Sequence, residues 1–209
     1  MPSLESRLLV VTDRHQTNGR PLLSVLSQAL RAGARAIQLR ERDLPVRDLL
    51  SLARDVHDMA VGCGNQLLIN DRIDVALALE RAGVHLRSDS LPLPATRLLL
   101  GSQRLLGISV HSVKEAVEAE KAGADYVVLG PVYETPSKQA YGPPLGLRTI
   151  EEACQLVKIP ILAIGGITAA RAYDVRRAGA FGVAVITAVL AAGEVESATR
   201  TLLGAVESS

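Results

Sequence analysis

Aromatic side chains are scarce in this sequence, which has no tryptophan, one phenylalanine and four tyrosines among 209 residues. Such a chain offers few rings on which nucleic-acid bases could stack. It also lacks an excess of charge of one sign, because 23 lysines and arginines are balanced by 22 aspartates and glutamates. Without a positive field to attract a phosphate backbone, nucleic acid is not an expected partner.

Cysteines and long apolar runs are scarce as well. Cys63 and Cys154 lie far apart without C-x-x-C spacing, which argues against a disulfide scaffold and a zinc site and fits a reducing compartment. The longest nearly continuous apolar stretch, residues 181–192, is too short to span a bilayer. Residues 1–7 show no signal-peptide pattern. We therefore expect a cytoplasmic protein that has no membrane partner.

Short β-branched runs alternate with amphipathic helical segments along the whole chain. This alternation predicts parallel β/α units. Eight such units closing on themselves make a single (β/α)8 TIM barrel over residues 1–209, an α/β fold. An open doubly wound sheet is the alternative, but no G-x-G-x-x-G follows the first run. The predicted strands are residues 8–11, 36–39, 66–69, 84–86, 105–109, 126–129, 161–164 and 183–186.

A short motif of a basic residue, alanine and glycine recurs just before four of these runs, at residues 31–33, 81–83, 121–123 and 177–179. Glycine is the residue that most easily takes the left-handed conformation that ends a helix. We predict a tight helix-to-strand turn at each of the four places.

Polar residues follow the second run on alternate positions. Gln38, Arg40 and Arg42 fall on one side of a strand with a period of two. Cationic donors gathered in a barrel mouth favour a bound anion. Ion pairs with Glu41 and Asp43 are the alternative interpretation.

The third, fourth and fifth runs also end in polar residues. Asp71 follows the third run, where capping of the next helix is the more common role and a magnesium site is the alternative. His85 has apolar neighbours and is more typical of a core histidine than of a catalyst. The four histidines show no zinc-binding spacing. The polar residues at these ends are Asn70 and Asp71; His85, Arg87, Ser88 and Asp89; and Ser109 and His111.

Loops follow the last three runs. Thr135, Ser137 and Lys138 lie in a long segment, 130–146, where they could contact an oxyanion or form a solvated turn. Gly165 with Gly166 and then Thr187 precede helices, an arrangement that offers backbone N–H groups to a phosphate, although tight turns alone would also need glycine.

Two anion sites are therefore predicted in one barrel mouth. Gly165, Gly166 and Thr187 suit a phosphate monoester, because that site has no charged side chain. The more cationic site, with Arg40, Arg42 and Lys138, suits pyrophosphate. The residues by themselves predict a barrel enzyme that acts on small phosphorylated molecules.

Seven motifs in order make the chain resemble the thiamine phosphate synthase / TenI family over nearly its whole length. The resemblance implies a (β/α)8 barrel of thiamine biosynthesis. A synthase is a transferase that couples hydroxymethylpyrimidine pyrophosphate with thiazole phosphate and releases pyrophosphate. The TenI branch includes a thiazole tautomerase. The motifs are QLRER (38–42), INDR (69–72), GVHL (83–86), GISVH (107–111), ADYVVLGP (124–131), TPSK (135–138) and AIGGI (163–167).

The resemblance also implies roles for individual residues. The implied catalytic residues are Arg40, Ser109 and Lys138. Asp71 matches a magnesium ligand of the synthases, and Asp89 is the second candidate. The expected partners are the two phosphorylated substrates and a second copy of the chain as a homodimer. The predicted substrate-binding residues are Gln38, Arg42, Asn70, His111, Thr135, Ser137, Gly165, Gly166, Ile186 and Thr187.

Departures from the family pattern leave three hypotheses. Ser90 stands where synthases have the second metal-binding aspartate, and Asp89 comes one residue early. Pro131 stands where the tautomerase has its catalytic histidine. A synthase is the first hypothesis, a tautomerase using His111 or His85 is the second, and a non-catalytic binder of thiazole phosphate is the third.

Overall fold

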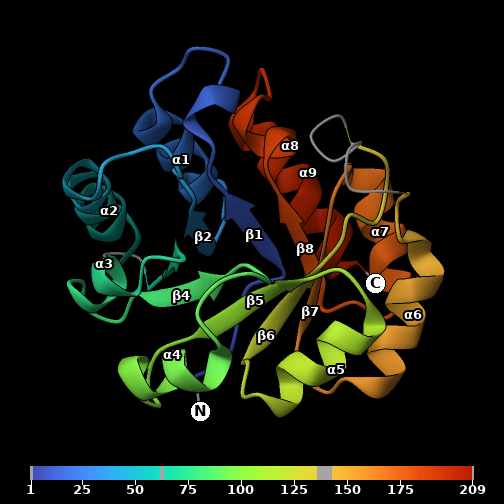
Figure 1. Ribbon diagram of the computed structural model, residues 1–209. Helices are drawn as coiled ribbons and strands as arrows, with labels where there is room; N and C mark the ends of the chain where they lie inside the picture. The colour runs from blue at the N-terminus through green and yellow to red at the C-terminus, as the bar shows by residue number, and fades with distance from the viewer. Residues whose placement is uncertain (1, 62–63, 136–142, 209) are drawn as a thin grey trace.

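A computed structural model describes residues 2–61, 64–135 and 143–208. Eight parallel strands close into a barrel in chain order, with helices around it, which confirms the predicted fold (Figure 1). The predicted strand bounds differ from the observed ones by at most one residue at either end. The strands are β1 (Leu8–Val11), β2 (Ala36–Leu39), β3 (Gln66–Asn70), β4 (Gly83–Leu86), β5 (Leu106–Val110), β6 (Tyr126–Leu129), β7 (Ile161–Ile164) and β8 (Gly182–Val185).

Helices connect the strands and cover the outside of the barrel. On α2, Leu49, Ala53 and Val56 are buried at helical spacing, as their pattern predicts, whereas Val46 in the first turn is 45% exposed. Within the described ranges, no helix is long and apolar enough to cross a membrane. The helices are the 3-10 helix η1 (Arg14–Gln16), α1 (Leu22–Arg31), α2 (Val46–Val61), α3 (Ile73–Leu77), α4 (Leu93–Leu100), α5 (Val113–Lys121), α6 (Gly146–Leu156), α7 (Ala169–Arg177), α8 (Thr187–Leu190) and α9 (Val195–Glu207).

The strand period of two divides the core into two parts. Leu8 and Val10 on β1 belong to the large cluster that packs the sheet against the helices. Leu9 and Val11 belong to a second cluster, which fills the inside of the barrel. The inward positions lead toward the barrel mouth, where they include the polar residues Gln38, Asn70 and His85 beside the apolar Val11 and Ile164.

The basic-alanine-glycine turns form as predicted at three of the four places. Gly33, Gly123 and Gly179 have φ of +107°, +93° and +99°. The second place is different, because Gly83 already belongs to β4 and Arg81 is the left-handed residue, at φ +59°. A Cβ at Gly83 would lie 2.6 Å from the carbonyl oxygen of Leu105, so that this glycine serves close packing between β4 and its neighbour.

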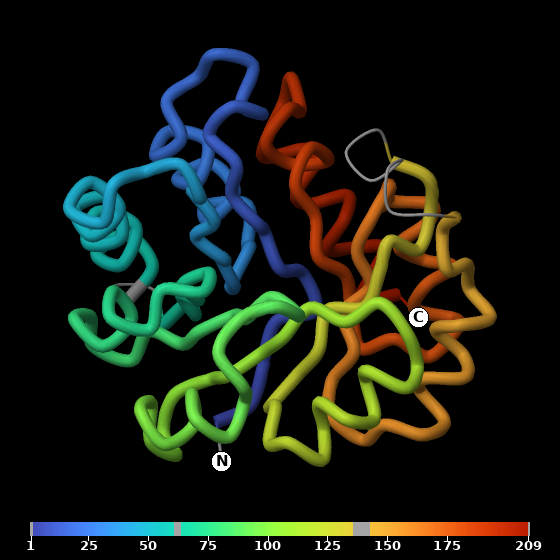
Figure 2. The backbone as a smooth tube through the Cα atoms, viewed as in Figure 1, coloured from blue at the N-terminus to red at the C-terminus, as the bar shows by residue number. Residues whose placement is uncertain are grey.

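The two ends of the chain meet around the barrel. β1 pairs with β8, and Figure 2 shows the blue first segments beside the red last ones. Above this pair, Asn18 donates a hydrogen bond of 2.9 Å to the carbonyl of Ala191, and Arg20 donates one of 2.7 Å to that of Leu190. The loop after β1 is thereby fixed against α8 at the rim of the barrel mouth.

Candidate active site

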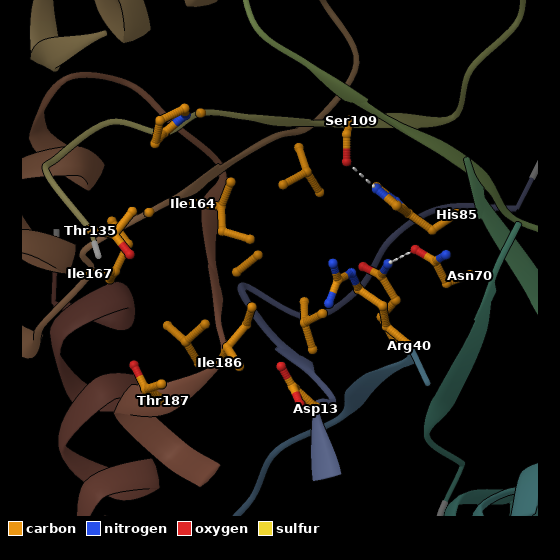
Figure 3. A pocket seen from close by; sticks show the side chains of 18 of the residues that line it. Asp13, Arg40, Asn70, His85, Ser109, Thr135, Ile164, Ile167, Ile186 and Thr187 are labelled. Atoms are coloured by element: carbon orange, nitrogen blue, oxygen red, sulfur yellow. Dashed lines mark hydrogen bonds between the residues drawn. The ribbon is translucent and has the colours of Figure 1, made fainter. Parts of the chain in front are cut away.

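A pocket of about 860 Å³ opens at the carboxyl ends of the strands, where barrel enzymes carry their sites. Figure 3 shows side chains from β2 to β5 on one side of it and side chains that follow β7 and β8 on the other. Most of the predicted site residues line this one pocket. They are Gln38, Arg40, Arg42, Asn70, Asp89, Ser109, His111, Thr135, Gly165, Gly166, Ile186 and Thr187.

The remaining three predicted residues are Asp71, Ser137 and Lys138. Asp71 lines a neighbouring cavity of about 270 Å³, together with Arg42, Asn70 and Arg87. Ser137 and Lys138 are outside the described residues. Their roles therefore stay predictions.

The inward side chains of β2 and β3 make one polar wall. Gln38 Nε2 donates a hydrogen bond of 3.0 Å to Asn70 Oδ1, and both side chains are buried (Figure 3). The backbone N–H of Arg40 donates to Thr12 Oγ1 at 2.9 Å, which ties β2 to the end of β1. Burial, followed by the nearby charge of Arg42, lowers the pKa of the Arg40 guanidinium. Arg40 is therefore a desolvated cation beside a second one.

The ion pairs suggested for Arg40 and Arg42 do not form. Glu41 instead accepts hydrogen bonds from Thr12 Oγ1 at 2.6 Å and from Arg14 Nη1 at 3.1 Å. Asp43 accepts two of 2.6 Å from the same Arg14 guanidinium. No carboxylate in the described part of the chain forms a salt bridge with Arg40 or Arg42. Neither Glu41 nor Asp43 therefore neutralises the two arginines, and a bound anion stays a prediction.

Behind this wall a buried chain of hydrogen bonds crosses three strands. His85 on β4 bonds through Nδ1 to the hydroxyl of Tyr126 on β6 at 2.8 Å. Its Nε2 bonds to the hydroxyl of Ser109 on β5 at 2.9 Å (Figure 3). Burial lowers the pKa of His85 to about 3, so that the ring is neutral. The ring of Tyr126 fits because Gly107 has no side chain, since a Cβ there would lie 2.0 Å from the tyrosine ring.

Because the His85 ring is neutral, the donor and the acceptor of each hydrogen bond in this buried series can be assigned. The fully buried hydroxyl of Tyr126 must donate its hydrogen, and within the described ranges its acceptor is His85 Nδ1. The ring proton is then on Nε2, which donates to Ser109 Oγ. The hydrogen of the Ser109 hydroxyl is left for a ligand in the pocket. Ser109 is thus a hydrogen-bond donor and not a nucleophile activated by His85.

His111 is held at the rim between two neighbouring strands. Its Nδ1 lies 2.6 Å from the carbonyl oxygen of Gly130, and a carbonyl can only accept, so Nδ1 carries the proton. Its backbone N–H donates to Glu115 at 2.8 Å, and Ser112 caps α5 by accepting from the N–H of Glu115 at 3.1 Å. These bonds at the start of α5 hold the backbone of His111, which lines the pocket.

The opposite side of the pocket is built from backbone and small side chains. Gly165 and Gly166 have φ of +101° and +64°, and Thr168 caps α7 just after them. Thr187 begins α8, whose first N–H groups have no acceptor within the helix. Gly165, Gly166 and Thr187 line the pocket and can offer N–H groups to a phosphate.

Asp71 is surrounded by hydrogen-bond donors. Its Oδ1 accepts from the backbone N–H of Arg87 at 3.1 Å and from the hydroxyl of Ser90. Its Oδ2 accepts from Asn70 Nδ2 at 3.1 Å and from Arg87 Nε at 2.5 Å. Burial raises the pKa of Asp71, but the hydrogen bonds from Ser90 and Arg87 outweigh it and the pKa is lowered. Asp71 is a carboxylate whose lone pairs are already in use.

A resident magnesium ion fits this arrangement poorly. A carboxylate has about four lone-pair sites, and four donors occupy those of Asp71. Asp89, the second candidate, is 70% exposed and lies 3.4 Å from the same guanidinium. The hydroxyl of Ser90 donates to Asp71 where a second carboxylate would be needed. Among the described residues, no group of three or more acidic, histidine or cysteine side chains could hold a metal ion.

Comparisons with known proteins agree with this geometry. The family model for thiamine monophosphate synthase matches residues 8–189. The chain belongs to this family. The thiamine-phosphate synthase of Roseiflexus sp. (strain RS-1) is 45% identical over 208 residues, which are 100% of this chain and 88% of that one. The putative thiamine-phosphate synthase of Geobacter sulfurreducens is 45% identical over 203 residues, which are 97% and 95% of the two chains.

Solved structures extend the likeness to three dimensions. Thiamine phosphate pyrophosphorylase from Pyrococcus furiosus has a TM-score of 0.88 and 35% identity, covering 97% of this chain and 96% of that chain. A 3-hexulose-6-phosphate synthase has a TM-score of 0.72 over 96% of this chain and 100% of that one, but at 14% identity it shows the fold alone. The thiamine monophosphate synthase family predicted from the ordered motifs is confirmed.

Several pocket residues of this family member were not predicted as site residues. Arg87 and Asp13 both line the pocket. The signal that could have found them is their place just after β4 and β1, at the positions that continue the inward side of each strand.

Proposed function

We propose that this protein is a thiamine-phosphate synthase, a transferase that couples hydroxymethylpyrimidine pyrophosphate with thiazole phosphate and releases pyrophosphate. One observation carries the proposal: a single pocket is lined both by the cationic residues Arg40 and Arg42 and by the glycine and helix-start residues Gly166 and Thr187. Figure 3 shows Arg40 and Thr187 on opposite sides of it. A reaction between two phosphorylated molecules needs two anion sites that face one reacting centre. Family membership and relatives of that name support the same reaction.

In the proposed reaction the pyrimidine methylene loses pyrophosphate and is attacked by the thiazole nitrogen. Negative charge builds up on the departing pyrophosphate, and a preorganised cation stabilises it. Arg40 is suited to this role because its backbone N–H is bonded to Thr12, its guanidinium is partly buried and it has no competing carboxylate partner in the described ranges. The nitrogen attacks with its own lone pair, so that this step needs no general base.

The remaining residues bind and orient the two substrates. Gln38 and Asn70 fix each other and face the pyrimidine side of the pocket. Ser109 offers the hydrogen of its hydroxyl, as the bonded ring of His85 directs. The N–H groups near Gly166 and Thr187 would hold the phosphate of the thiazole.

Whether the protein binds a resident magnesium ion is a separate question from the class of reaction. The resemblance implies Mg²⁺ with Asp71 and Asp89 as ligands, and the engaged lone pairs of Asp71 do not favour that prediction. We derive no step through a resident ion. A homodimer and a cytoplasmic location also stay predictions, and light scattering during size-exclusion chromatography measures the first.

The proposal is tested with purified protein and three assays in parallel. Incubation with both substrates should yield thiamine phosphate, detected by mass spectrometry, only when both are present. Isomerisation of a thiazole carboxylate phosphate without coupling would instead identify a tautomerase. Binding of thiazole phosphate in calorimetry without either conversion would identify a binder, and both of these results overturn the proposal.

A further inference from the structure

The guanidinium of Arg87 stands at the junction of the two cavities. It lines the main pocket and also the smaller cavity that contains Asp71. Its Nε donates to Asp71 Oδ2 at 2.5 Å, and its backbone N–H is held by Asp71 at 3.1 Å and by the Ser90 hydroxyl at 3.0 Å. The residue is held through its backbone N–H and its Nε, although 38% of its side chain is exposed.

Most of the donor capacity of Arg87 is unused. A guanidinium has five N–H donors, and the bond to Asp71 uses one of them. The Nη2 atom lies 3.4 Å from a carboxylate oxygen of Asp89, which is itself 70% exposed. Across the described ranges, no hydrogen bond occupies the two terminal nitrogens of Arg87. These nitrogens form a fork of the shape that binds two phosphate oxygens.

Arg87 is close enough to the other pocket arginines to affect them. Burial and the charge of Arg42 lower the pKa of Arg40, and the charge of Arg87 lowers it further, while Asp13 and Glu41 act in the opposite direction. Guanidinium groups that repel one another around one pocket are stabilised by an anion with several negative charges. A divalent cation placed against Asp71 would instead add to the repulsion.

We propose that Arg87 binds the pyrophosphate group of the substrate directly, in the place where a resident magnesium ion would act, and that Asp71 positions Arg87 instead of ligating metal. This inference rests on the proposed function, because that function supplies the pyrophosphate. Arg87 replaces a metal ion as a fixed positive charge that a planar fork presents to phosphate oxygens. The serine at position 90 completes the arrangement, because its hydroxyl donates to Asp71 where a second carboxylate would repel it.

The first test is calorimetric titration of the full chain with inorganic pyrophosphate, in EDTA and in Mg²⁺. Wild type should bind pyrophosphate in EDTA, and Arg87→Met should weaken that binding about tenfold or more, which is the range for charge-assisted hydrogen bonds. Arg31→Met is the control. Arg31 is also paired with a carboxylate, that of Glu196, but it lines neither cavity, so its loss should leave the affinity unchanged.

A double-mutant cycle tests the positioning role of Asp71. Asp71→Asn should weaken pyrophosphate binding in wild type but have little further effect when Arg87→Met is already present, because Asp71 acts through Arg87. Thermal unfolding of each variant checks that the barrel is intact. Equal and additive losses from the two substitutions would contradict the positioning role.

The second test measures metal binding without substrate. In electron paramagnetic resonance, wild type should not bind Mn²⁺ alone, whereas the Arg87→Gly/Ser90→Asp double variant should bind it, because a cation is removed and a carboxylate is added. The inference is overturned if wild type binds Mn²⁺ through Asp71, or if pyrophosphate binds in EDTA equally well without Arg87. These binding results do not depend on turnover, so they can be separated from a failure of the coupling assay.

Discussion

The hydrogen bond between Tyr126 and His85 sets the chemistry of Ser109 from a distance. Tyr126 does not line the pocket, yet its hydroxyl donates to His85 Nδ1 and so places the ring proton next to Ser109. A serine beside a histidine would otherwise be read as a nucleophile and its base. Here His85 Nε2 donates to Ser109 Oγ, so His85 does not act as the base of a nucleophilic serine.

Tyr126→Phe should therefore change the hydrogen bonding of Ser109, although Tyr126 itself does not line the pocket. The variant leaves Nδ1 of a buried ring without its donor, which costs about 1–3 kcal/mol of folding stability. It also releases the proton to either nitrogen, so ¹⁵N chemical shifts of His85 should report a mixture of tautomers. Tyr173→Phe, at a site that is 43% exposed, is the control and should change neither quantity. A wild-type tautomer with the proton on Nδ1 would refute the assignment.

The low pKa of His85 predicts how stability depends on pH. The ring has a pKa of about 3 in the folded state and about 6.5 when unfolded. Below pH 6.5 the unfolded chain gains a proton that the folded chain does not, so stability falls as the pH falls toward 3. Linkage gives a loss of about 2 kcal/mol between pH 7 and pH 5 from this one group.

Urea unfolding at pH 7 and pH 5 measures this loss. His85→Gln should reduce the pH dependence by about that 2 kcal/mol, whatever its effect on overall stability. An unchanged dependence in His85→Gln would mean that another group is responsible.

Among the elements, the loops after β6 and β7 depend on each other. A Cβ at Gly166 would lie 2.6 Å from the carbonyl oxygen of Glu134 and 3.0 Å from Cβ of Tyr133. Arg171 links the same two segments, because it donates to the carbonyl of Gly166 at 2.7 Å and stacks 4.6 Å from the centre of the Tyr133 ring. A change at Gly166 therefore moves the wall that carries Thr135.

Gly166→Ala should weaken the binding of thiazole phosphate in calorimetry while the barrel stays folded. The residue has φ +64°, where a side chain costs about 1–2 kcal/mol, and the clash adds to that strain. Gly193→Ala is the control, because nothing lies within 4 Å of its added Cβ. Unchanged binding by a folded Gly166→Ala variant would remove this loop from the phosphate site.

The segment that follows β6 also carries the predicted catalytic lysine. If Lys138 neutralises the leaving group, Lys138→Ala should lower turnover about a hundredfold and leave thiazole phosphate binding nearly intact. Lys114→Ala is the control, at a side chain that is 84% exposed on α5. Equal losses in turnover and in thiazole phosphate binding would show that the lysine does not act on pyrophosphate.

Sequence patterns predicted the elements well and their side-chain partners less well. Strand positions follow from β-branched runs, and these were right to within one residue at either end. The partner of Glu41 was not predictable, because Arg14 reaches it from the 3-10 helix after β1 and leaves Arg40 without an ion pair. The contact between Arg87 and Asp71 was also not predictable, because it joins two loops whose residues are 16 positions apart in the sequence.

At the scale of the whole molecule, barrel closure creates the site. Pocket residues range from Val11 to Ala188, and they meet because eight parallel strands end at one rim. Each strand contributes an inward-facing residue at its carboxyl end. No single strand therefore forms the anion sites, which are assembled from several strands. The family motifs are spread along the chain in the same way, which is why they could be recognised before the pocket was known.

The most direct test of the central claim is a single-turnover reaction in which thiamine phosphate and pyrophosphate are quantified in the same samples. The account predicts that both products appear at the same rate and in equal amounts. It also predicts that omission of either substrate prevents both. Release of pyrophosphate without thiazole phosphate, or no release by folded protein that binds both substrates, would contradict the claim.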